Sequence, residues 1–271
     1  ILAGDGRITM SVPIAHETSR EISGPVRLEY VAGEESITCI PLSGNDYTES
    51  YESTSLDTSQ SRFTYRHYPY DERIEIANES WQFANYDYAG NLEPSNKHCY
   101  FPSGFNPGWI YELIYPGQKP SVLGLGFLAV RDFLSFLRNG TSDENMQPNP
   151  LVEGETRTEK VYAWGISQSG RYLREFVYSG YNQGPNIQRV FDAIWPHVAG
   201  AGRIWLNGRF AQPGRYPCQQ TDHTYPSDQF PFAYSTTTDH LTGIADGIMK
   251  RPESDPLLFH TQTSAEYWER R

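Results

Sequence analysis

The first hundred residues alternate short apolar and polar stretches in the way typical of β-strands. Residues 8–12, 26–30 and 36–40 are rich in β-branched and aromatic residues, and Gly, Pro and charged residues separate them. Residues 43–62 contain many Ser, Thr, Asp and Glu residues and few aliphatic ones, which is typical of an exposed loop. The pattern predicts a hairpin-rich, antiparallel beginning followed by a loop.

The middle of the chain changes from a strand pattern to a helix pattern. Residues 109–115 are β-branched and aromatic, and they predict a strand that ends at Pro116-Gly117. From Gly124 onwards apolar residues recur at spacings of three and four until Asn139. This spacing predicts an amphipathic helix.

Strands and helices alternate in the second half. Residues 161–166 form an uncharged run of the kind found in strands buried on both faces, and a helix pattern over 172–177 follows. Further strand patterns lie at 190–195 and 257–261. This order predicts a parallel sheet with flanking helices. The Pro-rich residues 203–256 between the last two strands predict a cap or binding insertion.

Composition narrows the classes of function. The chain has 271 residues, of which 14% are aromatic, and this predicts a packed domain rather than disorder. It carries 22 Lys+Arg and 33 Asp+Glu residues, a net charge of −11, without a basic cluster, so we expect no nucleic-acid partner. No apolar run is long enough to span a membrane. The oligomeric state stays open.

Cysteine and histidine spacing predicts no metal centre. Cys39, Cys99 and Cys218 form no CxxC pair, which leaves one disulfide and one free thiol possible. The pairs Asp222-His223 and Asp239-His240 have no recognised ligand spacing. We therefore expect neither a metal nor another cofactor. The sequence leaves the compartment open, and we favour a secreted or periplasmic location slightly over a cytoplasmic one.

The strongest chemical motif lies where the strand pattern of residues 161–166 meets the following helix pattern. The residues there are Gly165-Ile166-Ser167-Gln168-Ser169-Gly170. A serine in a tight turn between a strand and a helix is the context of a nucleophile elbow, although the usual motif has Gly where Ser169 stands. Ser167 is the preferred nucleophile over Ser169, because only Ser167 has a Gly two positions before it. The alternative interpretation is a serine that only caps the helix.

Two neighbours of Ser167 are candidates for substrate contacts. The backbone N–H of Gln168 is the natural first donor to an oxyanion, and the second donor would come from residues 86–89 or 115–118. Arg171 places a cation in the first helical turn, where the helix dipole disfavours it. Arg171 therefore either pairs with a nearby carboxylate or recognises an acidic group on the substrate.

Four blocks carry a family resemblance, and they are residues 104–115, 122–138, 165–174 and 264–268. Together they resemble a largely uncharacterised family of α/β-hydrolase-domain proteins, over residues 100 to 271. The resemblance implies a serine hydrolase that acts on esters, with Ser167 as the nucleophile and the catalytic order Ser, acid, His along the chain.

That order directs attention to the end of the chain. Glu266 follows the strand pattern of residues 257–261 and is the expected acid, ahead of Asp192 and Asp255. None of the seven histidines follows Glu266. We therefore expect that the chain is truncated and that the catalytic histidine lies beyond Arg271; His260 and His197 are the alternatives within the chain.

These observations predict one α/β-hydrolase-like domain over residues 1–271, with a mostly parallel sheet flanked by helices. Its expected parts are a β-rich segment (1–100), a central sheet with the nucleophile turn (101–202), a cap or loop insertion (203–256) and an acid-bearing segment (257–271). The predicted function is a serine esterase that hydrolyses a small-molecule ester without a cofactor. The alternatives are a peptidase or amidase of the same fold, and a noncatalytic protein whose insertion binds a saccharide or a partner.

Overall fold

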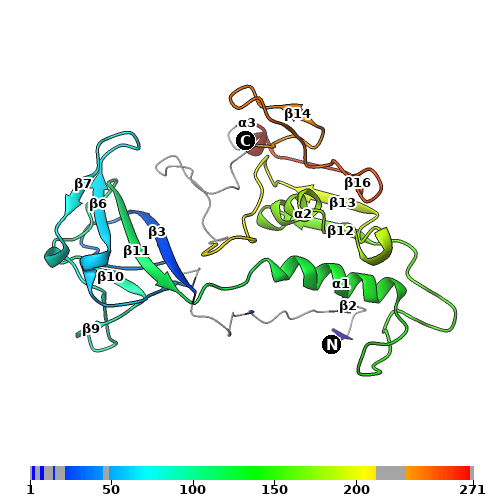
Figure 1. Ribbon diagram of the computed structural model, residues 1–271, viewed down its shortest axis with the longest axis horizontal. Coiled ribbons are helices and arrows are strands. Elements are labelled where there is room, and N and C mark those ends of the chain that lie inside the picture. Colours follow the sequence, from blue (N-terminus) through cyan, green and yellow to red (C-terminus); the bar gives the residue numbers. More distant parts are fainter. Residues whose placement is uncertain are drawn as a thin grey trace. The chain divides into compact units, whose positions relative to one another are not determined.

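The chain folds into two compact units in the computed structural model (Figure 1). The structure describes residues 2–3, 7–8, 15, 22–44, 49–211 and 230–268. Unit 1 comprises Ile1–Pro13, Gly124–Trp205 and Tyr225–Arg271, and unit 2 comprises Ile14–Leu123 and Leu206–Thr224. Residues 212–229 of the predicted insertion, with Cys218, Asp222 and His223, lie outside the described residues.

Unit 2 is built on an antiparallel sheet with the strand order β3-β11-β6-β7. β11 (Ile110–Gln118) pairs along its full length with β3 (Ser23–Val31) and on its other side with β6 (Arg62–Arg66). The sequence pattern predicts residues 109–115 and 161–166 in one central sheet. The pairing instead places β11 in the antiparallel sheet of unit 2 and residues 162–166 in a separate sheet of unit 1. β11 also continues through Pro116, which lies opposite Pro25, so that neither residue has to supply an N–H to this pair.

Shorter elements complete unit 2. The predicted loop of residues 43–62 contains a strand, a 3-10 turn and the start of β6. Glu52 and Ser53 pair with β11, and the Asp57 carboxylate caps the turn by accepting a hydrogen bond from the Ser59 N–H. The remaining elements are β4 (Cys39–Pro41), β5 (Glu52–Ser53), η1 (Thr58–Gln60), β7 (Ile74–Ile76), η2 (Asn78–Ser80), β8 (Ala84–Tyr86), β9 (Leu92–Pro94) and β10 (His98–Tyr100).

One face of the unit 2 sheet carries an aromatic core. Tyr111, Leu113 and Tyr115 alternate along β11 and are all buried. The rings of Phe105 and Tyr111 meet edge to face with their centroids 4.9 Å apart, and Phe63 packs beside them. Alternation along the strands therefore produces this core, as expected for a sheet whose one face is packed.

The other face of the same sheet carries buried charges. Glu29 of β3 lies directly opposite Glu112 of β11, and both side chains are buried. The fully buried Arg66 brings its Nη2 within 2.8 Å of Glu29 Oε1, and Arg73 brings its Nε within 2.9 Å of Glu112 Oε1. Arg27 also contacts Glu112. These arginines offset the repulsion between the two opposed carboxylates.

The two described cysteines, Cys39 and Cys99, are both free thiols. Cys39 of β4 pairs with Tyr100 and Cys99 of β10 pairs with Ile40, so the two thiols are one position out of register in this ladder. Successive side chains point to opposite faces of a strand, and the two thiols therefore lie on different faces. Burial raises the pKa of Cys39 to about 11, which keeps its thiol protonated at neutral pH.

Unit 1 contains a three-stranded parallel sheet with the order β12-β13-β16. The predicted alternation of strand and helix is confirmed here: β12 (Tyr162–Ile166) leads into α2 (Gln168–Tyr178), and β13 (Ala193–His197) and β16 (Leu257–Leu258) follow. Among the described residues, no helix has the length and apolar character needed to cross a membrane. The other elements of unit 1 are β1 (Leu2–Ala3), β2 (Arg7–Ile8), α1 (Leu125–Asn139), η3 (Pro185–Ile187), β14 (Thr237–Thr238), β15 (Ala245–Asp246) and α3 (Ser264–Trp268).

Aromatic side chains join the two main helices of unit 1. The predicted helix of residues 124–139 is confirmed as α1. Its buried Phe127 stacks on Tyr172 of α2 and on Tyr181, with ring centroids 4.8 and 4.9 Å apart. α2 ends at Tyr178 with Ser179 as its C-cap, and Gly180 takes the positive φ of 85° that closes the helix.

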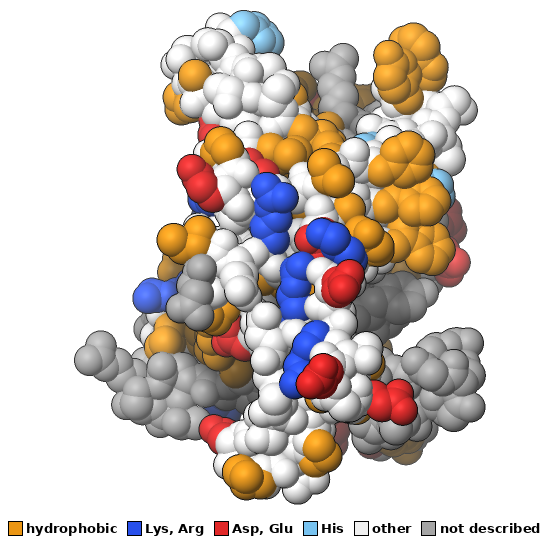
Figure 2. Space-filling view, turned by 90° about the vertical axis from the view of Figure 1, so that its right-hand side faces the viewer, with side chains coloured by type: hydrophobic (Ala, Val, Ile, Leu, Met, Phe, Trp, Pro, Cys, Tyr) orange, Lys and Arg blue, Asp and Glu red, His pale blue; other side chains and the backbone are white. Residues whose placement is uncertain are grey.

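The two faces of the parallel sheet differ in exposure. α2 packs against β12 and β13, where Gly165 and Ile194 are buried. On the other face Trp164 and Phe259 are 62% and 61% exposed within the described structure. The prediction that residues 161–166 are buried on both faces is therefore wrong for this strand, because among the described residues a helix covers only one of its faces. In the space-filling view of Figure 2, hydrophobic side chains gather in the upper part of the picture.

Candidate active site

Ser167 lies in the turn that joins β12 to α2, as the sequence predicts. Its backbone has φ 53° and ψ −114°, a region that residues with a Cβ rarely adopt. The residue is exposed at the carboxyl end of β12. Strained backbone of this kind persists only where the surrounding structure holds it, and it concentrates at functional sites.

Two glycines make this turn sterically possible. A Cβ at Gly165 would lie 2.5 Å from the carbonyl oxygen of Ser169. A Cβ at Gly170 would lie 2.8 Å from the Cβ of Ala199. Both positions therefore require glycine in this conformation. Ser169 itself is exposed, so the departure from the usual elbow motif costs no packing.

Backbone hydrogen bonds hold Ser167 on both sides. Its N–H donates to His197 O at 2.8 Å, and its carbonyl oxygen accepts from Arg171 N at 3.0 Å. β12 and β13 run parallel with Ile166 opposite His197, so Ser167 lies at the carboxyl edge of the sheet. In open α/β sheets ligands bind at this edge.

The first turn of α2 presents the two other residues singled out near Ser167. Gln168 is the first residue of α2, where the helix dipole is positive and favours an anion. Arg171 follows in the same turn and is half-buried. The two segments considered for a second oxyanion donor, residues 86–89 and 115–118, belong to unit 2, in the β8–β9 turn and at the end of β11.

His197 anchors the carboxyl edge of the sheet through its ring as well as its backbone. Its Nδ1 lies 2.8 Å from Thr261 Oγ1, which also accepts from Trp195 Nε1 at 2.8 Å. The next residue, Val198, has φ 47°, an outlier for a β-branched residue, and its N–H donates to Thr261 O at 2.8 Å. Two strained residues, Ser167 and Val198, thus directly follow the neighbouring strands β12 and β13 at the same edge of the sheet.

His260 lies in a different environment from His197. Its Nδ1 forms a short hydrogen bond with Tyr234 Oη, and the guanidinium of Arg174 lies 4.5 Å from the centre of the Tyr234 ring. Burial and the charge of Arg174 lower the pKa of His260 to about 4. Its Nε2 is buried and makes no hydrogen bond with the residues that the structure describes.

Arg174 is a second arginine of α2 near the Ser167 turn, and its contacts are not predictable from the sequence. This fully buried residue of α2 donates to the carbonyl oxygens of Ala201, Gly202 and Phe232 at 2.7 to 3.1 Å. Its guanidinium also lies over the ring of Tyr234. Arg174 therefore holds the segment that follows Val198. Only the charge at an otherwise apolar helix position could have indicated it.

Glu266 lies at the start of α3 and forms a reciprocal cap with Thr263. Its Oε2 accepts hydrogen bonds from the Thr263 N–H at 3.2 Å and from the Thr263 hydroxyl, while its own N–H lies 3.5 Å from Thr263 Oγ1. This arrangement is a capping box. In the described structure the carboxylate contacts neither His197 nor His260 through a hydrogen bond.

The weaker acid candidates are engaged in structural contacts. Asp192 precedes β13, at the end of the sheet opposite Ser167, and lies 2.9 Å from Arg138 Nη2. Burial opposes its ionisation, but the Val161 N–H and Arg138 lower the pKa of Asp192. Asp255 accepts from the Arg251 N–H at 2.7 Å. Both carboxylates therefore stabilise loops.

Metal-ligating side chains do not gather in the described ranges. No group of three or more His, Cys, Asp or Glu residues there could hold an ion. Asp239 accepts from the Thr242 hydroxyl and from the N–H groups of Leu241 and Thr242, and these bonds lower the pKa of Asp239. The side chain therefore shapes its own turn.

Comparison with known proteins identifies the family. A family model described as an alpha/beta hydrolase domain matches residues 91–269, which is well over half of the chain. No curated protein and no solved structure matches the sequence. The match includes the β12–α2 turn and the parallel strands on either side of α2. The chain belongs to the α/β-hydrolase-domain family.

Proposed function

We propose that the protein is a serine hydrolase that cleaves carboxylic esters of small molecules through an acyl-enzyme on Ser167. Membership of the α/β-hydrolase-domain family supports a hydrolase. The observation that carries the choice of residue is the left-handed backbone of Ser167, held between Gly165 and Gly170 at the carboxyl edge of the sheet. We propose that this turn serves as the nucleophile elbow.

The proposed reaction has two steps. In the first, Ser167 Oγ attacks the ester carbonyl carbon, a histidine takes the hydroxyl proton, and the C–O bond to the alcohol breaks as the alcohol receives that proton. In the second, water attacks the acyl-enzyme with the same base and releases the acid. The Gln168 N–H, in the positive first turn of α2, would stabilise the oxyanion in both steps.

The environments of the two described histidines near the sheet favour different roles. His260 has a pKa of about 4 and its Nδ1 is bonded to Tyr234, so it is a weak proton acceptor at neutral pH. His197 lies beside Ser167 in the sheet and Thr261 fixes its Nδ1. Of these two, His197 is the better candidate base. We propose Glu266 as the acid, which requires its carboxylate to leave the Thr263 cap.

Arg171 is the proposed contact to the substrate. A cation in the first turn of a helix is disfavoured by the helix dipole, which supports a role beyond helix formation. A guanidinium next to the reacting serine would favour esters that carry an acidic group. An Arg171→Gln variant is expected to raise KM for such esters more than for neutral ones.

Ester and amide substrates of matched structure test this proposal. We expect hydrolysis of p-nitrophenyl acetate, little hydrolysis of p-nitroacetanilide, and a fall of at least about 1,000-fold in kcat/KM for Ser167→Ala. Ser169→Ala is the matched control and is expected to change the rate little. Faster cleavage of the amide would indicate an amidase or peptidase, and hydrolysis of neither would favour the noncatalytic binding protein.

A further inference from the structure

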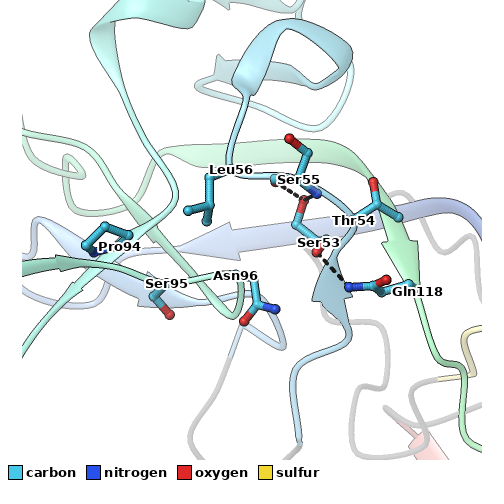
Figure 3. A pocket seen from close by; sticks show the side chains of 8 residues that line it. All are labelled: Ser53, Thr54, Ser55, Leu56, Pro94, Ser95, Asn96 and Gln118. Carbon is cyan, nitrogen blue, oxygen red and sulfur yellow. Dashed lines mark hydrogen bonds between the residues drawn. The ribbon is translucent and has the colours of Figure 1, made fainter.

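A cavity in unit 2 has no part in the proposed ester hydrolysis. It lies between residues 53–56, which follow β5, and residues 94–96, with Gln118 of β11 beside them (Figure 3). The cavity is open to solvent, since Thr54, Ser55 and Pro94 are exposed, and its volume is about 420 Å³. This falls within the range of sites that bind small molecules.

Hydrogen bonds between its walls hold the cavity open. Ser53 N–H donates to Asn96 O at 2.8 Å, and Thr54 N–H donates to Pro116 O at 2.9 Å. Gln118 Nε2 donates to Ser53 O at 3.2 Å, and Ser53 Oγ donates to Ser55 O at 2.7 Å. Because the two walls are tied to each other and to β11, the cavity is formed before any ligand arrives.

The side chains around this cavity are polar and neutral. They include the hydroxyls of Thr54 and Ser95 and the carboxamides of Asn96 and Gln118, and no lining residue in the described part of unit 2 is charged. The Thr54 hydroxyl and the Asn96 amide make no hydrogen bond to other described residues. An amide offers two N–H donors and one oxygen acceptor in a plane. These groups can therefore bind a ligand that both donates and accepts hydrogen bonds.

The nearest cations already have partners. Lys97 Nζ lies 3.0 Å from Glu49 Oε1, and Lys119 Nζ lies 3.1 Å from Glu52 Oε2. An anionic ligand would therefore find no uncompensated charge there. No lining residue is aromatic, so the cavity lacks the plane on which a nucleobase would stack.

We propose that this cavity binds a neutral saccharide. Neighbouring hydroxyls of a sugar ring match the paired donor and acceptor of the Asn96 amide, and Thr54 can bond a further hydroxyl. Leu56, which is 48% exposed, and Pro94 supply an apolar rim for the C–H face of the ring. The site is separate in sequence from residues 203–256, where the noncatalytic alternative would place saccharide binding.

Saturation-transfer NMR on the full chain tests this proposal with glucose, galactose, mannose and xylose at millimolar concentration. We expect saturation transfer to at least one of these sugars. The isosteric Thr54→Val should raise its Kd by about five-fold, since it removes one hydrogen bond, and Asn96→Ala should raise it by at least as much, since it removes the paired donor and acceptor. Gln60→Ala, an exposed glutamine in the same unit, is the control and should leave Kd unchanged.

The outcomes separate this proposal from the one for Ser167. Saccharide binding should persist in Ser167→Ala, even if no ester is hydrolysed. Absence of saturation transfer to all four sugars would overturn the proposal, and so would binding that Asn96→Ala and Thr54→Val both leave intact. Thermal unfolding of each variant shows that the fold survives the substitution. Binding of a short neutral peptide in place of the sugars would also overturn it.

Discussion

The two units bury charge in different ways. In unit 2, Arg66 and Glu29 are buried partners in a regular sheet, and side chains of opposite charge surround them. In unit 1, the buried Arg174 instead donates hydrogen bonds to backbone carbonyls, among them those of Ala201 and Gly202 in the irregular segment that follows Val198. Both units have non-glycine residues at positive φ, which are Ser36, Lys119 and Phe210 in unit 2 and include Ser167 and Val198 in unit 1. The comparison indicates that buried charge holds a regular sheet together in unit 2, whereas in unit 1 it holds irregular backbone in place.

The largest expected effect is on the charged face of unit 2. Glu112→Gln removes one of the two buried carboxylates that face Arg27, Arg66 and Arg73, and increases the excess of positive charge on this buried face. We expect the free energy of unfolding to fall by about 3–5 kcal/mol. Glu75→Gln, in the exposed pair with Arg62, is the matched control and should cost less than about 1 kcal/mol. Equal costs in urea unfolding would show that burial does not distinguish the two pairs.

A smaller effect is expected at the turn of unit 1. Gly165→Ala places a methyl group against the Ser169 carbonyl and should cost about 1–3 kcal/mol. Gly126→Ala in α1 meets no atom within 4 Å and should be neutral or stabilise by up to about 1 kcal/mol. Chemical denaturation of both variants measures the difference. If Gly165→Ala were as stable as Gly126→Ala, the turn would not be strained.

The pH dependence of unit 1 should reflect His260. Its pKa is about 4 in the folded chain and 6.5 when unperturbed, so the folded state resists protonation. The folded state therefore has its full stability with respect to His260 above pH 6.5, where the ring is neutral in both states. This stability is lost as the pH falls from 6.5 to about 4, because the unfolded chain binds the proton first. Allowing for its half-exposed position, we expect a loss of about 1–2 kcal/mol. The free energy of unfolding of His260→Gln, measured against pH, should lack this loss between pH 6.5 and 4. The same pH dependence in His260→Gln and in the unmodified chain would show that His260 does not cause it.

The smallest effect is expected at α3. Thr263→Ala removes the hydroxyl that forms the reciprocal cap with Glu266, and should cost about 0.5–1 kcal/mol. The same substitution frees the Glu266 carboxylate, which the proposed catalytic role requires. Measurement of kcat/KM alongside thermal unfolding separates these effects. A rise in activity with a small loss of stability would support Glu266 as the acid, whereas an unchanged rate would assign it to the helix cap alone.

Local patterns predicted the elements that depend on local physics. The spacing of apolar residues was sufficient for α1, and the glycines around Ser167 indicated the turn between β12 and α2. The partners of β11 were not predictable, because Glu112 reads as a solvent-facing position until the arginines of β3 and β6 are placed beside it. The contact of His197 with Thr261 joins residues far apart in the sequence, so no spacing could reveal it.

Labelling with a fluorophosphonate tests the central claim most directly, because this reagent reacts only with an activated serine. Intact-protein mass spectrometry and peptide mapping should show one adduct, on Ser167, in the unmodified chain and in Ser169→Ala. The Ser167→Ala variant should remain unlabelled. A label that survives in Ser167→Ala, or a label lost in Ser169→Ala, would contradict the account. The absence of any adduct on the unmodified chain would contradict His197 as the base.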